Sequence, residues 1–362
     1  MGLEMVRKTY LAVMLSVAVS SLLQSCKDDD VDSYDNERPK ATVSMLVTTN
    51  GLGDNGYNDD AAKGIFSFAN RFGLDVSLLR PRTVEEAREM YVRWTQEHSE
   101  GDSAVLVVGS SYYEEMLRGV GDLSGHEGET DKTGGSRRVL LYETKERDMP
   151  KGVSTLYMNR RGVCYLAGCM SKGSQAIVMV ADRKDPIVAD ALNAFKEAYE
   201  SHKDDGLEYT EYEFGDDETG FAKPDEAYFL TEIVSTFTLD GIVFPLLGGS
   251  TVGVIRYLNN EQVGNVRMIG MDVDQNELCQ DVAFSVGIYI GVAINWMLEE
   301  WLIGEEWDKL QVYGMEDGLT EIILSNDLQR DEQGRAYKDM MNEYYQEAIE
   351  EDRKHAEKLW YK

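Results

Sequence analysis

The run Ala176-Ile177-Val178-Met179-Val180 is apolar at every position. A strand with one face in water alternates apolar and polar residues, so a continuous apolar run indicates a strand covered on both faces. Patterns typical of helices precede and follow it, at about Arg161–Lys172 and Val188–Ser201. Strands that alternate with helices in this way build a parallel sheet from βαβ units.

The same alternation extends along the chain from Lys40 and forms two series. In the first series we expect strands at Thr42–Thr48, Asp75–Leu79, Ala104–Val108 and Arg138–Tyr142, with helices at about Asp59–Arg71 and Val84–Glu97. In the second series we expect strands at Val153–Tyr157, Ala176–Val180, Leu207–Phe214, Gly241–Pro245, Arg267–Met271 and Val282–Val286, with further helices at about Asp225–Thr236, Val252–Asn259 and Ile288–Ile303. Two series of similar size predict an α/β protein with two doubly wound parallel-sheet lobes.

Length and charge narrow the range of partners. A chain of 362 residues is near the upper limit of a single core, which favours two domains. It carries 66 acidic and 36 basic side chains, a formal net charge of −30. Contacts to phosphate need Lys and Arg, so this charge argues against nucleic acid as a partner. We expect a monomer that binds a small molecule.

The first 26 residues resemble the signal sequence of a bacterial lipoprotein. Arg7 and Lys8 form a basic start, and the apolar run from Tyr10 to about Leu23 is too short and too interrupted by serine to span a bilayer. It ends in Leu23-Gln24-Ser25-Cys26, which resembles a lipobox. The resemblance implies that residues 1–25 are removed and that Cys26 is acylated. An ordinary secretory peptide with a chance cysteine is the alternative.

Residues 26–40 form a polar tether after the predicted anchor. Several acyl chains on one cysteine would hold the protein stably on a membrane. Lys27-Asp28-Asp29-Asp30 resembles the acidic export tag of surface-exposed lipoproteins in some Gram-negative bacteria, and a solvated linker is an equal alternative. We therefore expect an outer membrane lipoprotein, either periplasmic or surface-exposed.

Four loops rich in glycine, Asp and Asn follow expected strands. Ligands of open α/β sheets bind at the carboxyl ends of the strands, where backbone N–H groups converge. The candidate ligand-binding residues in these loops are Asp54, Tyr57, Asn58, Gly109, Ser110, Gly248, Gly249 and Asp272. The loops share polar side chains and glycines that let a backbone approach a ligand closely.

Catalytic and metal sites are not indicated. Cys164, Cys169 and Cys279 are best interpreted as buried apolar residues, and the four histidines are not clustered. Asp272-x-Asp274-x-Asn276 begins like a calcium loop, but Glu277 stands where glycine is needed. There is no Walker A motif and no G-x-S-x-G elbow. We expect no metal, no cofactor and no enzymatic activity.

The loops together resemble the basic membrane lipoprotein family, the type I substrate-binding proteins of ABC importers typified by purine-nucleoside receptors. Four motifs run in family order: Gly53-Asp54-Asn55-Gly56-Tyr57-Asn58-Asp59-Asp60-Ala61 for G-x-x-D-x-S-F-N, Tyr165-Leu166-Ala167-Gly168 for Y-L-A-G, Gly248-Gly249-Ser250-Thr251-Val252-Gly253-Val254 for G-G-x-G-x-G-V, and Gly270-Met271-Asp272-Val273-Asp274-Gln275 for G-x-D-x-D-Q. The last is the most specific, and the ordered set is stronger than any single motif.

The resemblance implies a type I periplasmic-binding-protein fold whose two lobes are joined by three crossovers and close on a ligand by hinge motion. It implies that Asp54 and Asn58 bind a base, that Tyr57 lines the base pocket, that Asp272 accepts hydrogen bonds from ribose-like hydroxyl groups and that Gly249 presents its backbone. The family's Ser-x-x-Lys lysine is absent from Ser285-Val286-Gly287-Ile288, and Arg183 could supply the lost charge.

These observations predict a domain plan and a function. The plan is a signal peptide at 1–25, the lipidated tether at 26–40, an N-terminal lobe of 41–152 plus about 286–308, a C-terminal lobe of 153–285 plus about 309–335, and a charged helix at 336–362. The expected function is capture of a small polar ring-containing ligand, most simply a nucleoside, for uptake through an ABC permease or a surface transport complex. The alternative is a surface lipoprotein with a recognition or signalling role and a diverged cleft.

Overall fold

The computed structural model describes residues 41–54, 56–98, 102–123, 136–261, 263–324 and 332–360. The chain divides into two units, residues 1–38 and 39–362, and the described residues all belong to the second. The signal peptide, Cys26 and the tether therefore lie outside the described residues, and their assignment stays a prediction.

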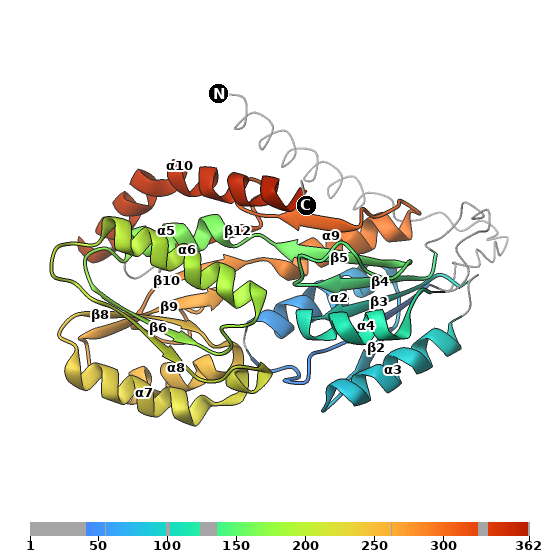
Figure 1. Ribbon diagram of the computed structural model, residues 1–362, viewed down its shortest axis with the longest axis horizontal. Coiled ribbons are helices and arrows are strands. Elements are labelled where there is room, and N and C mark those ends of the chain that lie inside the picture. Colours follow the sequence, from blue (N-terminus) through green and yellow to red (C-terminus); the bar gives the residue numbers. More distant parts are fainter. Residues whose placement is uncertain are drawn as a thin grey trace, which may run out of the picture. The chain divides into compact units, whose positions relative to one another are not determined.

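The described strands form two six-stranded sheets (Figure 1). The first has the order β11-β5-β4-β3-β1-β2 and all its strands are parallel. Its strands are β1 (Thr42–Leu46), β2 (Val76–Leu79), β3 (Ala104–Gly109), β4 (Arg138–Tyr142), β5 (Val153–Met158) and β11 (Leu310–Tyr313). The second has the order β12-β10-β9-β8-β6-β7, with only β12 antiparallel to its neighbour. Its strands are β6 (Gln175–Val180), β7 (Tyr209–Glu213), β8 (Gly241–Leu246), β9 (Val266–Asp272), β10 (Val282–Ile288) and β12 (Thr320–Leu324).

Helices cover both faces of each sheet, as the apolar runs in the strands require. On the first sheet, α2 (Tyr57–Phe72) and α9 (Ile290–Leu302) cover one face, and α3 (Val84–Glu97) and α4 (Glu114–Val120) cover the other. On the second sheet, α5 (Arg161–Met170) and α6 (Pro186–His202) cover one face, and α7 (Pro224–Phe237) and α8 (Thr251–Glu261) cover the other. The expectation of an α/β fold with two doubly wound lobes is confirmed.

The described chain passes between the two sheets three times. The crossovers are the short connections from β5 to α5, from β10 to α9 and from β11 to β12. Three short parallel connections form a hinge, because only a few backbone dihedrals must change for one lobe to rotate against the other. This agrees with the three crossovers that the family resemblance implies.

Two strand placements expected from the sequence are corrected. The strand expected at Val153–Tyr157 was placed at the start of the second lobe, but the strand there, β5, belongs to the first sheet and pairs with β4 on one side and β11 on the other. Leu310–Tyr313 also lies in the first sheet, whereas the segment from about 309 was expected in the second lobe. The chain therefore changes lobe after β5, at residues 159–160, and not before it. A lobe boundary that falls between a strand and the following helix does not change the alternation of apolar strands and amphipathic helices, so it cannot be located from that alternation.

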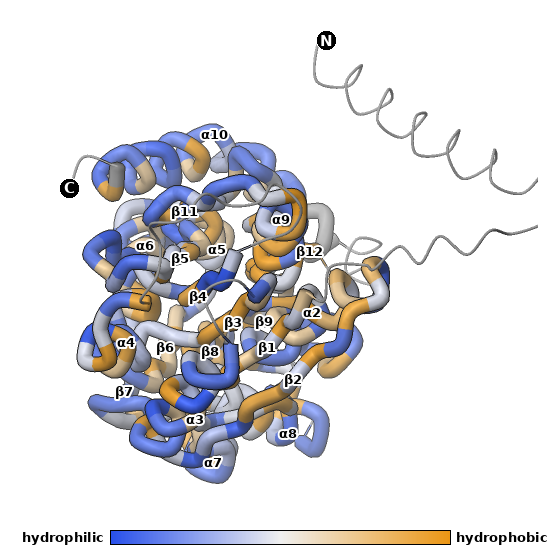
Figure 2. Tube along the Cα trace, turned by 90° about the vertical axis from the view of Figure 1, so that its right-hand side faces the viewer, coloured by the Kyte–Doolittle hydropathy of each residue, from blue (hydrophilic) through white to orange (hydrophobic). Residues whose placement is uncertain are grey.

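The C-terminal helix α10 (Glu332–Trp360) packs against α5, as expected for a helix docked on the body. Figure 2 shows it as a largely hydrophilic helix with interspersed apolar residues. Its Asp352 is buried and accepts hydrogen bonds from the backbone N–H groups of Gly162 (3.0 Å) and Met315 (3.0 Å). No helix among the described residues is long and apolar enough to cross a bilayer.

Candidate ligand-binding cleft

A cavity of about 420 Å³ lies between the two lobes, at the carboxyl ends of strands from both sheets. This size is within the range typical of small-molecule sites. Of the predicted binding residues, those that line it are Asp54, Tyr57, Asn58, Ser110, Gly248, Gly249 and Asp272. Gly109 does not line it: the Tyr142 ring packs on this glycine so closely that a Cβ would lie 2.2 Å from the ring. The roles of these residues toward a ligand are proposals, taken up below.

Asp54 organises the first loop of the cleft. Its carboxylate accepts hydrogen bonds from the backbone N–H groups of Gly56 (3.0 Å), Asn58 (3.0 Å) and Asp59 (3.3 Å), and from the Asn58 side chain (3.0 Å). These donors belong to the start of α2, where a helix favours negative charge. Gly51-x-Gly53-x-x-Gly56 has the spacing of a dinucleotide-binding loop, but Asp54 already occupies the N–H groups that a pyrophosphate would need.

Asp272 ends strand β9 and faces the cavity from the second lobe. It has a positive φ of 70°, a left-handed conformation that is uncommon for a residue other than glycine. Among the described residues, no hydrogen-bond partner of its carboxylate is found. Its pKa is raised to about 7, chiefly by burial and also by the nearby Asp54 and Glu143 carboxylates, while Arg160 opposes the rise. A half-buried carboxylate with free acceptors is suited to hydroxyl or amine donors of a ligand.

The floor of the cleft holds an ion pair that the sequence did not reveal. Glu143, which follows β4, and Arg160, in the first crossover, form a salt bridge and are each only 2% exposed. Glu143 also accepts a hydrogen bond from the Met158 N–H (3.2 Å), and its own N–H donates to the Leu156 carbonyl (2.7 Å). Burial alone would lower the pKa of Arg160, but Glu143 raises it above its ordinary value. Burial raises the pKa of Glu143, and Arg160 and the Met158 N–H oppose that rise. The guanidinium of Arg160 is therefore charged, and its salt bridge with Glu143 fixes its position.

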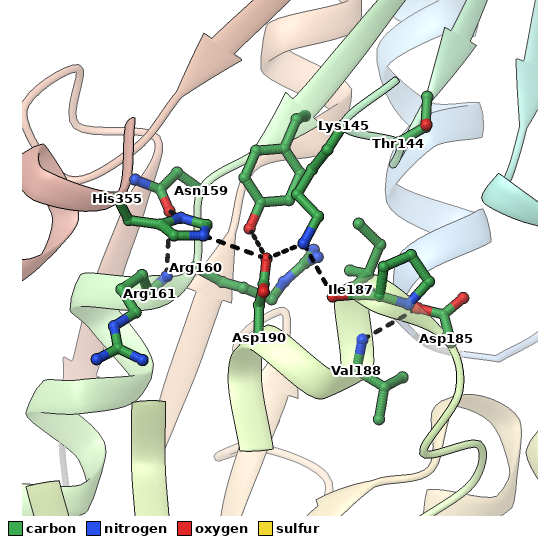
Figure 3. Close-up of polar contacts among 12 residues, drawn as sticks. Thr144, Lys145, Asn159, Arg160, Arg161, Asp185, Ile187, Val188, Asp190 and His355 are labelled. Carbon is green, nitrogen blue, oxygen red and sulfur yellow. Dashed lines mark hydrogen bonds and ion pairs between the residues drawn. The ribbon is translucent and has the colours of Figure 1, made fainter. Parts of the chain in front are cut away.

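Polar contacts join the two lobes across the cleft. Ser111 of the first lobe donates to Asp185 (2.9 Å), and Tyr112 donates to Asp182 (2.7 Å). Asp185 caps α6 by accepting from the N–H groups of Ile187 and Val188, shown in Figure 3. The Ser111–Asp185 and Tyr112–Asp182 hydrogen bonds require the lobes to be close, so the structure represents a closed arrangement of the hinge.

Arg183 lies away from the cavity. It forms ion pairs with Glu211 and Glu213 on the edge strand β7, and it does not line the cleft. The suggestion that Arg183 supplies the charge of the missing family lysine is therefore not supported by its position. Arg160 is the arginine that reaches the cleft.

The described lining carries an excess of negative charge. Its acidic side chains are Asp54, Glu143, Asp185, Glu218 and Asp272, and its only described basic side chain is Arg160. Because Glu143 already neutralises Arg160, an anionic ligand would meet unopposed carboxylates. The lining thus favours an uncharged or cationic ligand. Among the described residues, no group of His, Cys, Asp or Glu side chains is arranged to hold a metal ion.

The chain matches no protein-family model and no curated protein. Solved structures do share its fold. A solute-binding protein of an ABC transporter system from Aeropyrum pernix K1 is 15% identical, with a TM-score of 0.67 over 87% of this chain and 90% of that one. The periplasmic binding component of an arabinose ABC transporter from Shewanella sp. ANA-3, bound to α- and β-L-arabinofuranose, is 11% identical, with a TM-score of 0.56 over 89% and 99%. A transcriptional activator of the comK gene from Bacillus halodurans is 16% identical, with a TM-score of 0.59 over 84% and 98%. This chain therefore has the two-lobed fold of periplasmic solute-binding proteins.

Proposed function

We propose that this protein is a solute-binding protein that captures a small, uncharged, polar ring-containing molecule between its lobes and passes it to an ABC permease. The observation that carries this proposal is the cavity at the hinge, which is lined from both lobes and contains the Asp272 carboxylate, for which the described residues provide no hydrogen-bond partner. The solved structures that share the fold include binding components of ABC transporters, one of them bound to a sugar. The lining is acidic, which is compatible with sugars and nucleosides.

A nucleoside is the first candidate ligand. The loop with Asp54, Tyr57 and Asn58 and the end of the Asp272 strand line the same cavity and lie next to each other, since a Cβ on Gly56 of that loop would be 3.4 Å from the Asp272 carboxylate. Tyr57 offers a ring face, and Asp272 offers acceptors for two neighbouring hydroxyl groups. A carboxylate hydrogen bond of this charged kind contributes about 1.5–3 kcal/mol.

The experiment is native mass spectrometry of the purified full-length protein, followed by titration with inosine, inosine 5′-monophosphate, D-galactose and L-arabinose. We expect a mass increment equal to a small neutral molecule or saturable binding of inosine. Binding of sugars alone would remove the nucleoside assignment and keep the solute-binding function. No retained ligand and no binding of any of the four would overturn the proposal.

We further propose that Cys26 carries the lipid anchor and that the protein resides in the outer membrane, on its periplasmic or outer face. The support is the lipobox-like Leu23-Gln24-Ser25-Cys26 and the tether-like composition that follows it. The full chain and its Cys26→Ser variant should fractionate differently, the first with membranes and the second with soluble protein. Identical fractionation would contradict the anchor.

A recognition role is the second candidate function. It is favoured by an exposed apolar stripe on α7, where Phe229, Ile233 and Phe237 are 61%, 52% and 83% exposed. Residues four apart lie on one side of a helix, so the three form one continuous surface. The mass spectrum and the titrations together separate the two functions, because a protein with a diverged cleft would neither retain a ligand nor bind any of the four compounds.

A further inference from the structure

The buried guanidinium of Arg160 has hydrogen-bonding capacity that the described protein does not use. An arginine carries five N–H donors, and here Nη2 pairs with Glu143. Nε and Nη1 are buried and have no hydrogen-bond partner among the described residues. The hydroxyl group of Tyr57, which also lines the cavity, is unpartnered in the same way. Buried donors without acceptors are costly, so such groups usually have a partner that completes them.

The position of Arg160 points to a ligand as that partner. Its side chain is part of the cavity lining, and the Asp272 carboxylate is close enough to raise the pKa of Arg160. The described lining of the cavity thus contains both unused donors of Arg160 and unused acceptors of Asp272. A molecule that carries a donor and an acceptor on neighbouring atoms can satisfy both, and a pair of adjacent hydroxyl groups or an amide-like ring edge has this arrangement.

The net charge of the Arg160–Glu143 pair determines which kind of ligand group can accept hydrogen bonds from Arg160. Glu143 cancels the charge of Arg160, and the other charged side chains of the described lining are all acidic. A phosphate or carboxylate would gain little from a neutralised guanidinium and would be repelled by the carboxylates. A hydroxyl or carbonyl oxygen gains the hydrogen bonds without that repulsion.

We propose that Arg160, held in place by Glu143, determines specificity in the cleft by donating hydrogen bonds to a hydroxyl or carbonyl oxygen of an uncharged ligand. This inference rests on the proposed solute-binding function. Arg160 contacts the ligand, and Glu143 is a positioning residue that fixes the guanidinium.

The test is isothermal titration of the full chain and three variants with inosine. Arg160→Gln removes both the positive charge and the planar guanidinium with its Nε and Nη1 donors. Arg160→Lys keeps a positive partner for Glu143 but lacks these two donors. Arg183→Gln is the matched control, because this arginine is ion-paired on the outer edge of the second lobe. We expect both Arg160 variants to bind at least tenfold more weakly and the control to bind like the parent. Thermal unfolding checks that Arg160→Lys is folded.

Analogues locate the contact. The panel is nebularine, which lacks the 6-oxo group, and 2′-, 3′- and 5′-deoxyinosine. One of these analogues should bind the parent more weakly than inosine does. The same analogue and inosine should bind Arg160→Lys equally well, because this variant already lacks the contact. Arg160→Lys binding inosine as tightly as the parent would overturn the inference and leave the nucleoside assignment standing. If the parent binds D-galactose or L-arabinose and not inosine, the same variants are titrated with that sugar. If the parent binds neither inosine nor either sugar, both the Arg160 inference and the proposed solute-binding function are overturned.

A second, independent observation concerns α10, which contacts both lobes and two crossovers. On the second lobe, Tyr165 of α5 donates to Glu347 (2.6 Å). At the first crossover, Asn159 donates to the Asp352 carbonyl (2.8 Å), and at the third, the Met315 N–H donates to the Asp352 carboxylate (3.0 Å). Figure 1 shows the helix running alongside α5.

The end of α10 reaches the first lobe. Leu359 is buried in a cluster with Tyr157 and Leu310 of the first sheet and Ile187 of the second lobe. The Leu359 carbonyl also accepts a hydrogen bond from Arg147, which follows β4 (3.4 Å).

Asp190 of α6 joins the three parts, as Figure 3 shows. Its carboxylate accepts from Tyr157 (2.6 Å) and Lys145 (2.8 Å) of the first lobe. It also lies 3.6 Å from Nε2 of His355 in α10, while Nδ1 of the same ring is 2.8 Å from the Asn159 side chain. Lobe, crossover and helix thus share one network behind the cleft.

We infer that α10 is a strap across the hinge that favours the closed arrangement of the lobes. The test uses spin labels on Gln96→Cys in α3 and Asn260→Cys in α8, which are exposed positions on the two lobes. Cys26 is replaced with serine in all of these proteins, and the three described cysteines are buried and should not be labelled.

Pulsed electron paramagnetic resonance then gives the interlobe distance distribution of the ligand-free protein. Deleting residues 355–362, or replacing Leu359 with alanine, should lengthen and broaden it, whereas Glu357→Ala, an exposed change on the same helix, should not. A distribution unchanged in both strap variants would contradict the inference.

Discussion

Replacing Asp272 with asparagine should stabilise the protein while removing its ligand binding. In the folded protein the pKa of this carboxyl is raised from 3.8 to about 7, chiefly by burial. A raised acid pKa means that folding takes up a proton between these two values, so the stability of the parent falls as the pH rises from about 4 to about 7. The cost of ionising Asp272 at pH 8 is then up to about 4 kcal/mol.

Asparagine has nearly the same shape and no charge, so Asp272→Asn escapes this cost. The variant should be more stable than the parent at pH 8 by no more than about 4 kcal/mol, with the difference shrinking toward zero near pH 4. Denaturant unfolding at pH 4, 6 and 8 gives the free energy of unfolding of both proteins. At the same time, loss of the charged acceptor should weaken inosine binding at least tenfold at pH 8.

The dependence on pH is the decisive part of this result. A stability difference that is the same at all three pH values would show that the carboxylate is not destabilised by its surroundings. A variant less stable than the parent at pH 8 would refute the reasoning, because it would mean that ionised Asp272 is stabilised by partners in the folded protein.

Three further predictions concern the attachment of α10, the packing of α2 against α9 and the charge of the ligand. Asp352→Ala should destabilise the protein by about 2 kcal/mol in denaturant unfolding, because it leaves two buried backbone N–H groups without acceptors; Asp339→Ala, an exposed change on the same helix, should have little effect. Gly64→Ala should cost about 3 kcal/mol or more, because its Cβ would lie 2.0 Å from the Gly291 carbonyl oxygen where α2 meets α9, whereas Gly119→Ala in open space on α4 should be neutral or stabilising; thermal unfolding of the two variants distinguishes them. Inosine 5′-monophosphate should bind at least tenfold more weakly than inosine in titration calorimetry, because the described lining offers its phosphate no unpaired cation; equal affinity would contradict the charge argument.

The fold could be predicted from the sequence where strands are buried on both faces. Runs such as Ala104–Val108 and Ala176–Val180 are apolar at every position, and the structure has β3 and β6 there. The two strands that were not expected, β11 and β12, are short and partly exposed, so their composition does not separate them from loops. The β-propensity of single residues is a weak guide at the edges of a sheet, where pairing with the neighbouring strand decides the conformation.

The cleft was predictable only in part, for a related reason. Asp54, Asn58 and Asp272 lie in strand-end loops, and position relative to strands is visible in the sequence. Arg160 and Glu143 were missed because their meeting depends on where the chain changes lobe and on the left-handed backbone of Glu143, whose φ is 61°. The sequence Asn159-Arg160-Arg161 offers no way to tell the arginine that enters the cleft from its neighbour.

Isothermal titration of the purified full-length protein with inosine, beside its Asp272→Asn variant, tests most directly whether the interlobe cleft is a ligand site. If the ligand binds in this cleft, the parent gives saturable heat with one site per chain and the variant binds at least tenfold more weakly at pH 8. Inosine bound equally well by the two proteins would contradict the assignment of the ligand to this cleft.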